Sequence, residues 1–280
     1  MISKLTILIF TLVSLTLHAQ NEEKKYELER LTRKKNHIKE GFIYDYDIVT
    51  NDSSLVSHNF YDSTGNMTKR KNYNPNGKHS YDGIFTYNDK GLKIQETGYD
   101  ENGDLMQVFV YTYDNDGNQT DYQQLSPNRK ILVHQKRVFN SKRQQTELYN
   151  KLYNEDKFHL AATYSYNAEG NQIGSTTYTK NGDTGDLSEY TYDSYGNLTA
   201  IYHTGNQGKI LVRTDHYDDK QQLIESKFYQ RNKYYTDGQL ALAPTDRRTV
   251  FKYDIDGNKI EELEWNKTVL VKRTRYYFIK

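Results

Sequence analysis

The amino-acid sequence predicts an all-β protein of tandem antiparallel β-hairpin repeats that form a curled or superhelical meander sheet. Two observations predict this fold class. A short motif, Tyr-Asp-x-x-Gly or a close variant, recurs along most of the 280 residues, and the segments between its copies have the length of single β-strands. Mean hydropathy is low, at −0.97, yet the chain holds 27 tyrosines and 10 phenylalanines. Such rings build half-buried sheets without raising hydropathy.

The motif copies follow a regular spacing. The aromatic residues at Tyr61, Tyr73, Tyr87, Tyr99 and Tyr113 are separated by 12, 14, 12 and 14 residues, so one short and one long strand alternate. Further copies begin at Tyr166, Tyr178, Tyr192 and Tyr253, and degenerate copies without the glycine begin at Phe139 and Tyr217. Because short loops join antiparallel neighbours, we expect a meander of about 18 strands.

The residue types of the motif predict the geometry of each turn. The Asp or Asn side chain after the tyrosine accepts hydrogen bonds from the turn backbone, and the glycine three residues later takes a left-handed conformation. A type I′ turn needs positive φ at both central residues, which Lys90, Glu169 and Tyr195 resist. We therefore expect type I turns that are closed by a glycine bulge.

The long strands end in an aromatic-x-aromatic pattern, and residues two apart on a strand share one face. Packing against the neighbouring strands is the first explanation for these rings. Exposed rings also stack on the apolar faces of sugars, so ligand contact is a second interpretation that the sequence leaves open. The candidate ligand-contacting residues are Tyr111, Tyr113, Tyr164, Tyr166, Tyr190, Tyr192 and Trp265.

The chain divides into three segments. Residues 1–19 are typical of a secretory signal peptide, because Lys4 precedes an apolar run that ends at Leu17. That run is too short to span a bilayer comfortably, so we expect no transmembrane segment in the mature chain. Residues 20–41 are a charged lead-in, either a short helix or a frayed segment. Residues 42–280 form one repeat array.

Charge and cysteine content exclude several classes of protein. Removal of Lys4 with the signal peptide lowers the cation count from 38 to 37, which equals the 37 acidic residues, so the mature chain is formally neutral. Nucleic acid is therefore a disfavoured partner. The chain has no cysteine, which excludes disulfides and cysteine-ligated metals. We expect an exported protein of a bacterium, in the periplasm or outside the cell at its surface.

The extended motif Tyr-Asp-x-x-Gly-Asn occurs in Tyr61–Asn66, Tyr113–Asn118, Tyr192–Asn197 and Tyr253–Asn258. These segments resemble the YD repeats of the RHS family of bacterial surface and toxin-encapsulating proteins, and the resemblance covers most of residues 61–260. It implies antiparallel strips that curl, and a surface location. This chain departs from the family in its shorter, alternating spacing and its lack of a boundary before a toxin domain. We also expect the array to be too small for a closed shell.

Metal binding and catalysis receive little support from the sequence. Asp114–Asn118 and Asp254–Asn258 resemble fragments of calcium loops, but an EF-hand spacing needs its first ligand at Thr112 or Lys252, so structural turns are favoured over a calcium site. The eight histidines lack metal-ligand spacing, and there is no nucleophile elbow or phosphate loop. We expect no metal, no cofactor, no catalytic residues and no enzymatic activity.

The sequence therefore predicts a non-catalytic exported repeat protein, a cell-envelope or extracellular binding or scaffold module. Carbohydrate is a candidate ligand, and an envelope protein is a candidate partner. The alternative is an accessory or remnant of an RHS-type toxin-encapsulating system. An outer-membrane barrel is disfavoured, because segments such as Met67–Tyr73 and Lys142–Tyr149 offer no alternating apolar face.

Overall fold

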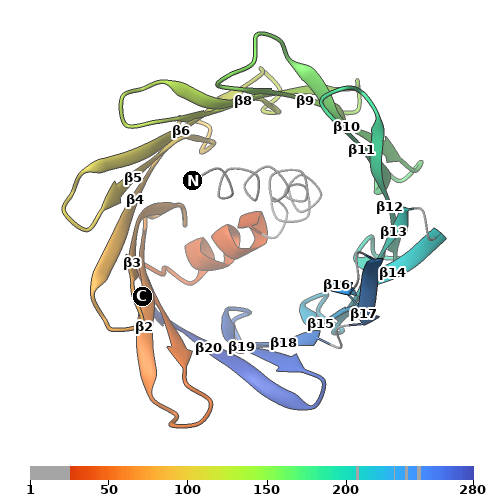
Figure 1. The fold of residues 1–280 in the computed structure, drawn as a ribbon. Coiled ribbons are helices and arrows are strands. Elements are labelled where there is room, and N and C mark those ends of the chain that lie inside the picture. Colours follow the sequence, from red (N-terminus) through yellow and green to blue (C-terminus); the bar gives the residue numbers. More distant parts are fainter. Residues whose placement is uncertain (1–25, 206–207, 230, 237–238, 245–246) are drawn as a thin grey trace.

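The computed structural model describes residues 26–205, 208–229, 231–236, 239–244 and 247–280. It shows a closed antiparallel β-barrel around an N-terminal helix (Figure 1). Eighteen strands form one sheet, and two more form a separate hairpin. The predicted signal peptide lies outside the described residues.

The strands are short and follow one another closely along the chain. They are β1 (Glu40–Tyr46), β2 (Ser53–Tyr61), β3 (Met67–Tyr73), β4 (His79–Tyr87), β5 (Lys93–Asp100), β6 (Leu105–Tyr113), β7 (Gln119–Leu125), β8 (Ile131–Phe139), β9 (Gln145–Leu152), β10 (His159–Tyr166), β11 (Gln172–Tyr178), β12 (Thr184–Tyr192), β13 (Leu198–Gly205), β14 (Gly208–Tyr217), β15 (Leu223–Phe228), β16 (Arg231–Thr236), β17 (Gln239–Pro244), β18 (Arg247–Tyr253), β19 (Lys259–Asn266) and β20 (Val269–Ile279).

Closure of the sheet is the main difference from the sequence prediction. β1 pairs with β2 on one side and with β20 on the other, where Glu40 lies opposite Ile279 and Tyr46 opposite Arg273. The prediction of an open, curled or superhelical meander is therefore wrong, and so is the expectation that the array is too small for a closed shell. Twist and coiling accumulate from strand to strand until the first and last strands meet, and their pairing satisfies both free edges.

The meander connectivity itself is confirmed. Each strand from β1 to β15 pairs antiparallel with the next strand in sequence, and the series continues through β18, β19 and β20. The β16–β17 hairpin is an insertion, because β15 pairs directly with β18, with Glu225 opposite Val250. The ring thus keeps its order although two strands are added between neighbours.

The predicted turn geometry is also confirmed. In the β2–β3 turn the Gly65 N–H donates to the Asp62 carbonyl oxygen at 3.0 Å, and Asp62 Oδ1 accepts from the Asn66 N–H at 3.0 Å. Gly65 has φ 82°, the left-handed value expected of a glycine bulge. The same aspartate-to-backbone bond recurs at Asp114, Asp193 and Asp254.

Side chains alternate between a lumen face and an outer face of the wall. The helix of residues 26–35 lies inside the ring (Figure 1), and its Tyr26 hydroxyl is 3.2 Å from the hydroxyl of Tyr87 on β4. Tyr87 therefore faces the lumen. Because residues directly opposite on paired strands share a face, the strand registers then assign the other residues.

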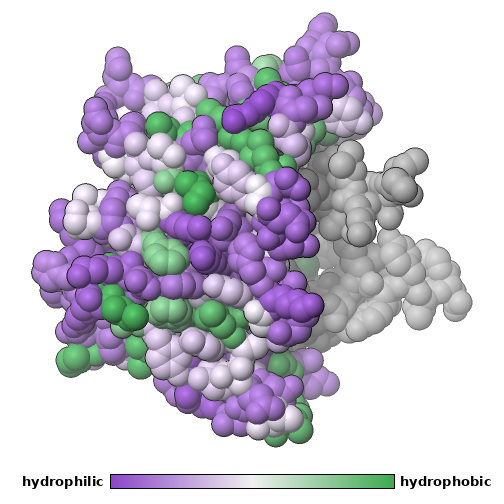
Figure 2. Space-filling view, turned by 90° about the vertical axis from the view of Figure 1, so that its left-hand side faces the viewer, coloured by the Kyte–Doolittle hydropathy of each residue, from purple (hydrophilic) through white to green (hydrophobic). Residues whose placement is uncertain are grey.

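The outer face is mainly polar. Ion pairs link strands there: Lys69 and Asp82 join the neighbouring strands β3 and β4, at 2.9 Å, and Lys209 on β14 reaches across β13 to Glu189 on β12, at 2.7 Å. In Figure 2, hydrophilic residues cover most of the visible outer wall, and hydrophobic residues form small separate groups. Within the described part of the chain, no helix has the length and apolar character needed to cross a membrane.

A substitution in the β7–β8 turn can test the turn geometry. There an exposed arginine, Arg129, occupies the left-handed position that glycine holds in other turns, with φ 63°. Strain at that position costs an L-residue about 1 kcal/mol. We expect Arg129→Gly to raise the free energy of unfolding by about 0.5 kcal/mol, since glycine also loses more chain entropy on folding. Urea denaturation measures the change. Gly77→Ala is the converse control, because Gly77 has φ 77° and a methyl group there meets nothing within 4 Å. This change should lower the free energy of unfolding. Unchanged urea midpoints in both variants would contradict the left-handed turn position.

Candidate functional site: the barrel lumen

The charged lead-in forms a helix over residues 26–35. Ion pairs at i,i+3 and i,i+4 spacing support it: Glu27–Arg30, at 2.6 Å, and Glu29–Arg33, at 3.4 Å. The helix ends where His37 adopts φ 55° and the Ile38 N–H donates to the Arg33 carbonyl oxygen at 3.0 Å, a Schellman-type cap. This cap directs the chain from the lumen into β1.

Arg33 is the main anchor of the helix in the lumen. Its Nε donates to the Gly65 carbonyl oxygen at 3.0 Å, and its guanidinium lies 4.8 Å from the centre of the Tyr61 ring and 5.4 Å from that of Tyr26. Only 7% of Arg33 is exposed. Burial raises the pKa of Tyr61, and the positive charge of Arg33 opposes that rise.

The helix contacts turns on both sides of the closing strand pair. Arg30 Nη1 donates to the Thr64 carbonyl oxygen at 2.8 Å, in the β2–β3 turn. Asn36 Nδ2 donates to Asn258 Oδ1 at 3.2 Å, in the β18–β19 turn. The approach is close, because a Cβ atom on Gly65 would lie 2.3 Å from the Arg30 carbonyl oxygen. The helix thus holds together the two turns that flank the β1–β20 closure.

Tyrosines line the lumen at the ends of the long strands. The last tyrosine of such a strand donates its hydroxyl proton to the carbonyl oxygen of the first residue in the short strand beside it. These bonds are Tyr87 to Met67 (2.8 Å), Tyr113 to Lys93 (2.7 Å), Tyr166 to Gln145 (2.7 Å), Tyr192 to Gln172 (2.7 Å) and Tyr253 to Leu223 (3.1 Å). Each bond closes the open end of a strand pair, opposite its turn.

The structure brings six of the seven candidate ligand-contacting residues to one face. Tyr111, Tyr113, Tyr164, Tyr166, Tyr190 and Tyr192 all face the lumen by strand register. Tyr164 and Tyr190 are only 9% and 5% exposed and pack in two small apolar clusters, with Ala162 and Ile201 among their neighbours. Trp265 lies apart on the outer face, where Arg248 is 4.9 Å from its ring centre. Ligand contact by these residues stays a prediction.

Charged side chains among the lumen tyrosines were missed by sequence reasoning. Lys93 Nζ lies 4.6 Å from the ring centre of Tyr111, and Lys259 Nζ lies 4.4 Å from that of Tyr276. Lys259 and the Tyr276 hydroxyl both contact Glu262, at 3.1 and 3.0 Å. The repeat motif could have indicated these lysines. Lys93 and Lys259 each begin a strand directly after a turn, and each lies opposite a lumen tyrosine.

A second lumen cluster lies on β14 and β15. Arg213 makes a two-pronged ion pair with Asp215, with both N–O distances 2.7 Å, and the Ser226 hydroxyl donates to Asp215 Oδ1 at 2.7 Å. Asp215 is 4% exposed and Ser226 is 2% exposed. These partners compensate the buried charge of Asp215.

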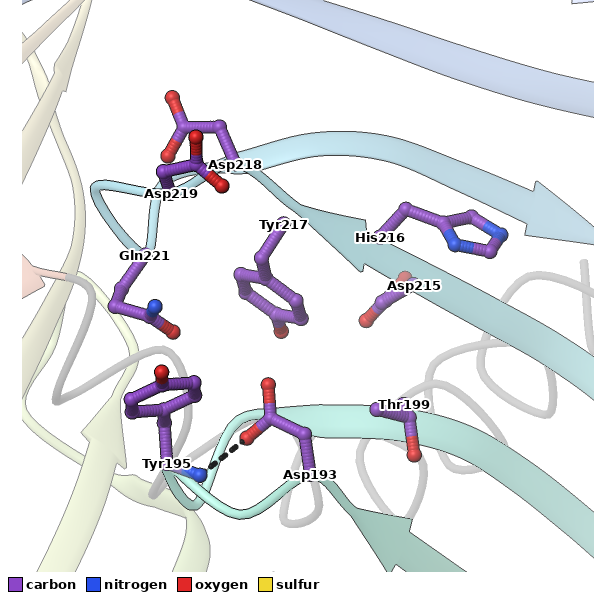
Figure 3. A pocket seen from close by; sticks show the side chains of 9 residues that line it. All are labelled: Asp193, Tyr195, Thr199, Asp215, His216, Tyr217, Asp218, Asp219 and Gln221. Atoms are coloured by element: carbon purple, nitrogen blue, oxygen red, sulfur yellow. Dashed lines mark hydrogen bonds between the residues drawn. The ribbon is translucent and has the colours of Figure 1, made fainter.

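A cavity of about 380 Å³ lies between the β12–β13 and β14–β15 turns (Figure 3). Its lining includes Asp193 and Tyr195 from one turn and Asp218 and Asp219 from the other. The Tyr195 N–H donates to Asp193 Oδ1 at 2.9 Å, shown dashed in Figure 3. Burial opposes ionisation, but hydrogen bonds from Asn197 and the turn backbone lower the pKa of Asp193. In the described residues, no group of three histidine or carboxylate side chains is placed so that it could hold a metal ion.

This chain is only weakly similar to known proteins. No family model matches the chain, and no curated protein matches it. The solved structure of TcdB2-TccC3 has 15% sequence identity and a TM-score of 0.38, over 82% of this chain and 14% of that one. A porin-like protein from Bacteroides uniformis has 13% identity and a TM-score of 0.43, over 86% of this chain and 96% of that one.

The Photorhabdus luminescens Tc holotoxin pore has 15% identity and a TM-score of 0.35, over 83% of this chain and 14% of that one. The chain therefore spans 14% of the length of the toxin chains it matches. The YD-repeat motif of this chain stays a resemblance to the RHS family.

Buried lumen tyrosines predict a loss of stability at high pH. Burial raises the pKa of Tyr192, Tyr253 and Tyr276 to about 12, whereas an unfolded tyrosine titrates near about 10. Between these values the unfolded chain has lost protons that the folded chain retains, so stability is full below pH 10 and falls as the pH rises toward 12. Urea midpoints followed by circular dichroism should stay level from pH 7 to 9 and then decline; a level midpoint through pH 11.5 would contradict the burial.

Tyr192→Phe tests the hydroxyl bond at the open end of a strand pair. Loss of the bond to the Gln172 carbonyl oxygen should lower the free energy of unfolding by about 1 kcal/mol. Tyr195→Phe is the matched control, because Tyr195 is 73% exposed and should unfold as the wild type does. If both variants have the wild-type urea midpoint, the bond does not stabilise the barrel.

Proposed function

We propose that this chain is a non-catalytic, exported binding module of a bacterial envelope or surface, and that its lumen receives a polypeptide segment of an envelope protein. One observation carries the proposal. The lumen already holds residues 26–35 of its own chain, through hydrogen bonds and cation–π contacts. The wall therefore has the chemistry needed to bind peptide.

The way in which the helix is held supports exchange with another segment. A helix of this length is marginal in water, so the wall must supply most of its stability. Among the described residues, the side-chain hydrogen bonds to the barrel come from Tyr26, Arg30 and Arg33 of the helix and from Asn36 directly after it, and they reach β4 and the turns beside β2 and β19. A segment held by a few polar contacts opens more readily than the sheet itself.

The rest of the wall offers rings together with a small number of charges. Lys93 beside Tyr111 and Lys259 beside Tyr276 are two such places. Aromatic linings with a few fixed polar groups are typical of binding compartments. The ion pairs on the outer face support a barrel with water outside it, since a lipid-facing barrel carries an apolar band there.

A second candidate is an accessory or remnant of an RHS-type toxin-encapsulating system. The observation in its favour is the closed wall around a chain segment. A neighbouring gene for a toxin or an immunity protein would favour this function, and an isolated gene would count against it.

Arg33→Ala tests the lumen as a binding compartment. The change removes the bond to Gly65 and the stacking on Tyr61, so the helix should leave the lumen more often. A fluorescent peptide of residues 26–39 should then bind the variant more tightly than the wild type by about tenfold or more. Fluorescence anisotropy measures the binding.

Hydrogen exchange in residues 26–35 provides the second readout and should speed up in Arg33→Ala. Lys35→Ala is the matched control, because Lys35 is exposed on the same helix and should behave as the wild type in both measurements. An exposed helix that no peptide replaces would show that the lumen has no affinity for peptide, and the proposal would be withdrawn.

A further inference from the structure

An aromatic groove lies on the outer face at the closing strand pair. Phe42, Tyr44, Tyr46, Ser53 and Tyr277 line a cavity of about 350 Å³. The first three alternate along β1 and so share one face, and Tyr277 lies directly opposite Phe42 on β20. This is the outer face, because Gly41, the residue before Phe42, lies under the lumen residue Tyr61, with its Cβ position 3.2 Å from the Tyr61 hydroxyl.

The rings form a corner rather than a closed stack. Tyr44 and Tyr277 meet edge to face, with ring centres 5.6 Å apart and planes at 85°. Phe42 is stacked on His58 at 4.1 Å, which extends the aromatic floor to β2. Tyr277 remains 45% exposed. A ring face that borders an open cavity can accept the flat, apolar C–H face of a sugar ring.

Polar groups fixed at the rim add hydrogen-bonding capacity. The Tyr46 and Tyr277 hydroxyls are 3.0 Å apart, and the Arg275 guanidinium lies 5.0 Å from the Tyr46 ring centre. Arg275 forms hydrogen bonds to both hydroxyls and to Glu261, and these raise its pKa, so it is always charged. The groove therefore has an aromatic floor and a cationic rim.

Charge at the rim favours an anionic ligand. Glu261 is the single carboxylate that Lys252, Arg273 and Arg275 share, at 2.6, 3.0 and 3.1 Å. Three cations against one carboxylate leave positive charge beside the groove. At its far end, the carboxylate of Glu40 is paired with His58 at 2.7 Å.

The aromatic residues of β1 are not required by the repeat. The motif tyrosines of the long strands face the lumen, whereas β1 carries no Tyr-Asp-x-x-Gly turn. Elsewhere on the outer face, charged residues neutralise one another in pairs such as Lys69–Asp82 and Lys209–Glu189. Packing between repeats therefore does not explain why aromatic residues gather on the outer face of β1.

We propose that the groove of Phe42, Tyr44, Tyr46 and Tyr277 binds an acidic glycan, with a uronate-type sugar ring stacked on the tyrosines and its carboxylate on Arg275. This site is separate from the lumen and does not depend on what the lumen binds.

Calorimetric titration with oligogalacturonate tests the proposal on the purified mature chain. The methyl-esterified oligosaccharide is the matched ligand, because it has the same rings without the charge. We expect the wild type to bind the acid form more tightly. Tyr277→Ala should weaken binding of both ligands by about fivefold to tenfold. Arg275→Gln should weaken binding of the acid form alone, by about tenfold or more.

Control variants separate a lost site from a lost fold. Tyr195→Ala removes an exposed tyrosine on a turn remote from the groove in sequence and sheet order, and it should bind as the wild type does. Tyr277→Phe keeps the ring and the β1–β20 contact and should retain most of the affinity, so a folding defect in Tyr277→Ala does not hide the answer. Circular dichroism establishes that each variant is folded.

Three outcomes would overturn the proposal. They are a wild type that binds neither oligosaccharide, equal affinity for the acidic and esterified forms, and wild-type binding by both Tyr277→Ala and Arg275→Gln. Arg33→Ala, which disturbs the lumen helix, should leave this binding unchanged. Failure of the groove and failure of the lumen are thereby distinguishable.

Discussion

Hydrogen bonds from tyrosine hydroxyls to strand carbonyls hold the repeats of this barrel in register. A hairpin with a tight turn is fixed at one end and free to fray at the other. Here the free end is closed by a tyrosine side chain on the lumen face that reaches back to the preceding strand, as Tyr87 of β4 does to Met67 of β3. The bond from Tyr253 to Leu223 shows its importance. It adds to the backbone pairing of β18 with β15, two strands that the inserted β16–β17 hairpin separates in sequence.

Local chemistry made the strands and turns predictable, whereas the closed shape depends on pairing across the whole chain. The glycine at Gly65 and the aspartate at Asp62 determine their turn within five residues, so the motif alone was enough. Closure requires β1 to pair with β20, and β1 carries no copy of the motif. Nothing in the spacing of the tyrosines says how many strands complete a turn of the barrel, because twist per strand is a property of the assembled sheet.

The candidate site shows the same division between local and long-range information. The sequence grouped Trp265 with the lumen tyrosines because all are repeat aromatics. Register separates them: Trp265 lies opposite Arg248 on the outer face, while Tyr190 lies opposite Ile201 on the lumen face. A shift of one residue exchanges the two faces of a strand. The lumen helix was missed as a binding element for another reason, since its position depends on the turns at Gly65 and Asn258, which the sequence places nearly two hundred residues apart.

Pairing of the first strand with the last has a consequence for how the molecule is made. Until β20 has been synthesised, β1 and the last completed strand each have an edge with unpaired backbone groups, which can pair with other chains. A chain that lacked β20 would form an open sheet with two unpaired edge strands. Pairing of β20 with β1 is therefore the step that removes the last two unpaired edges of the sheet.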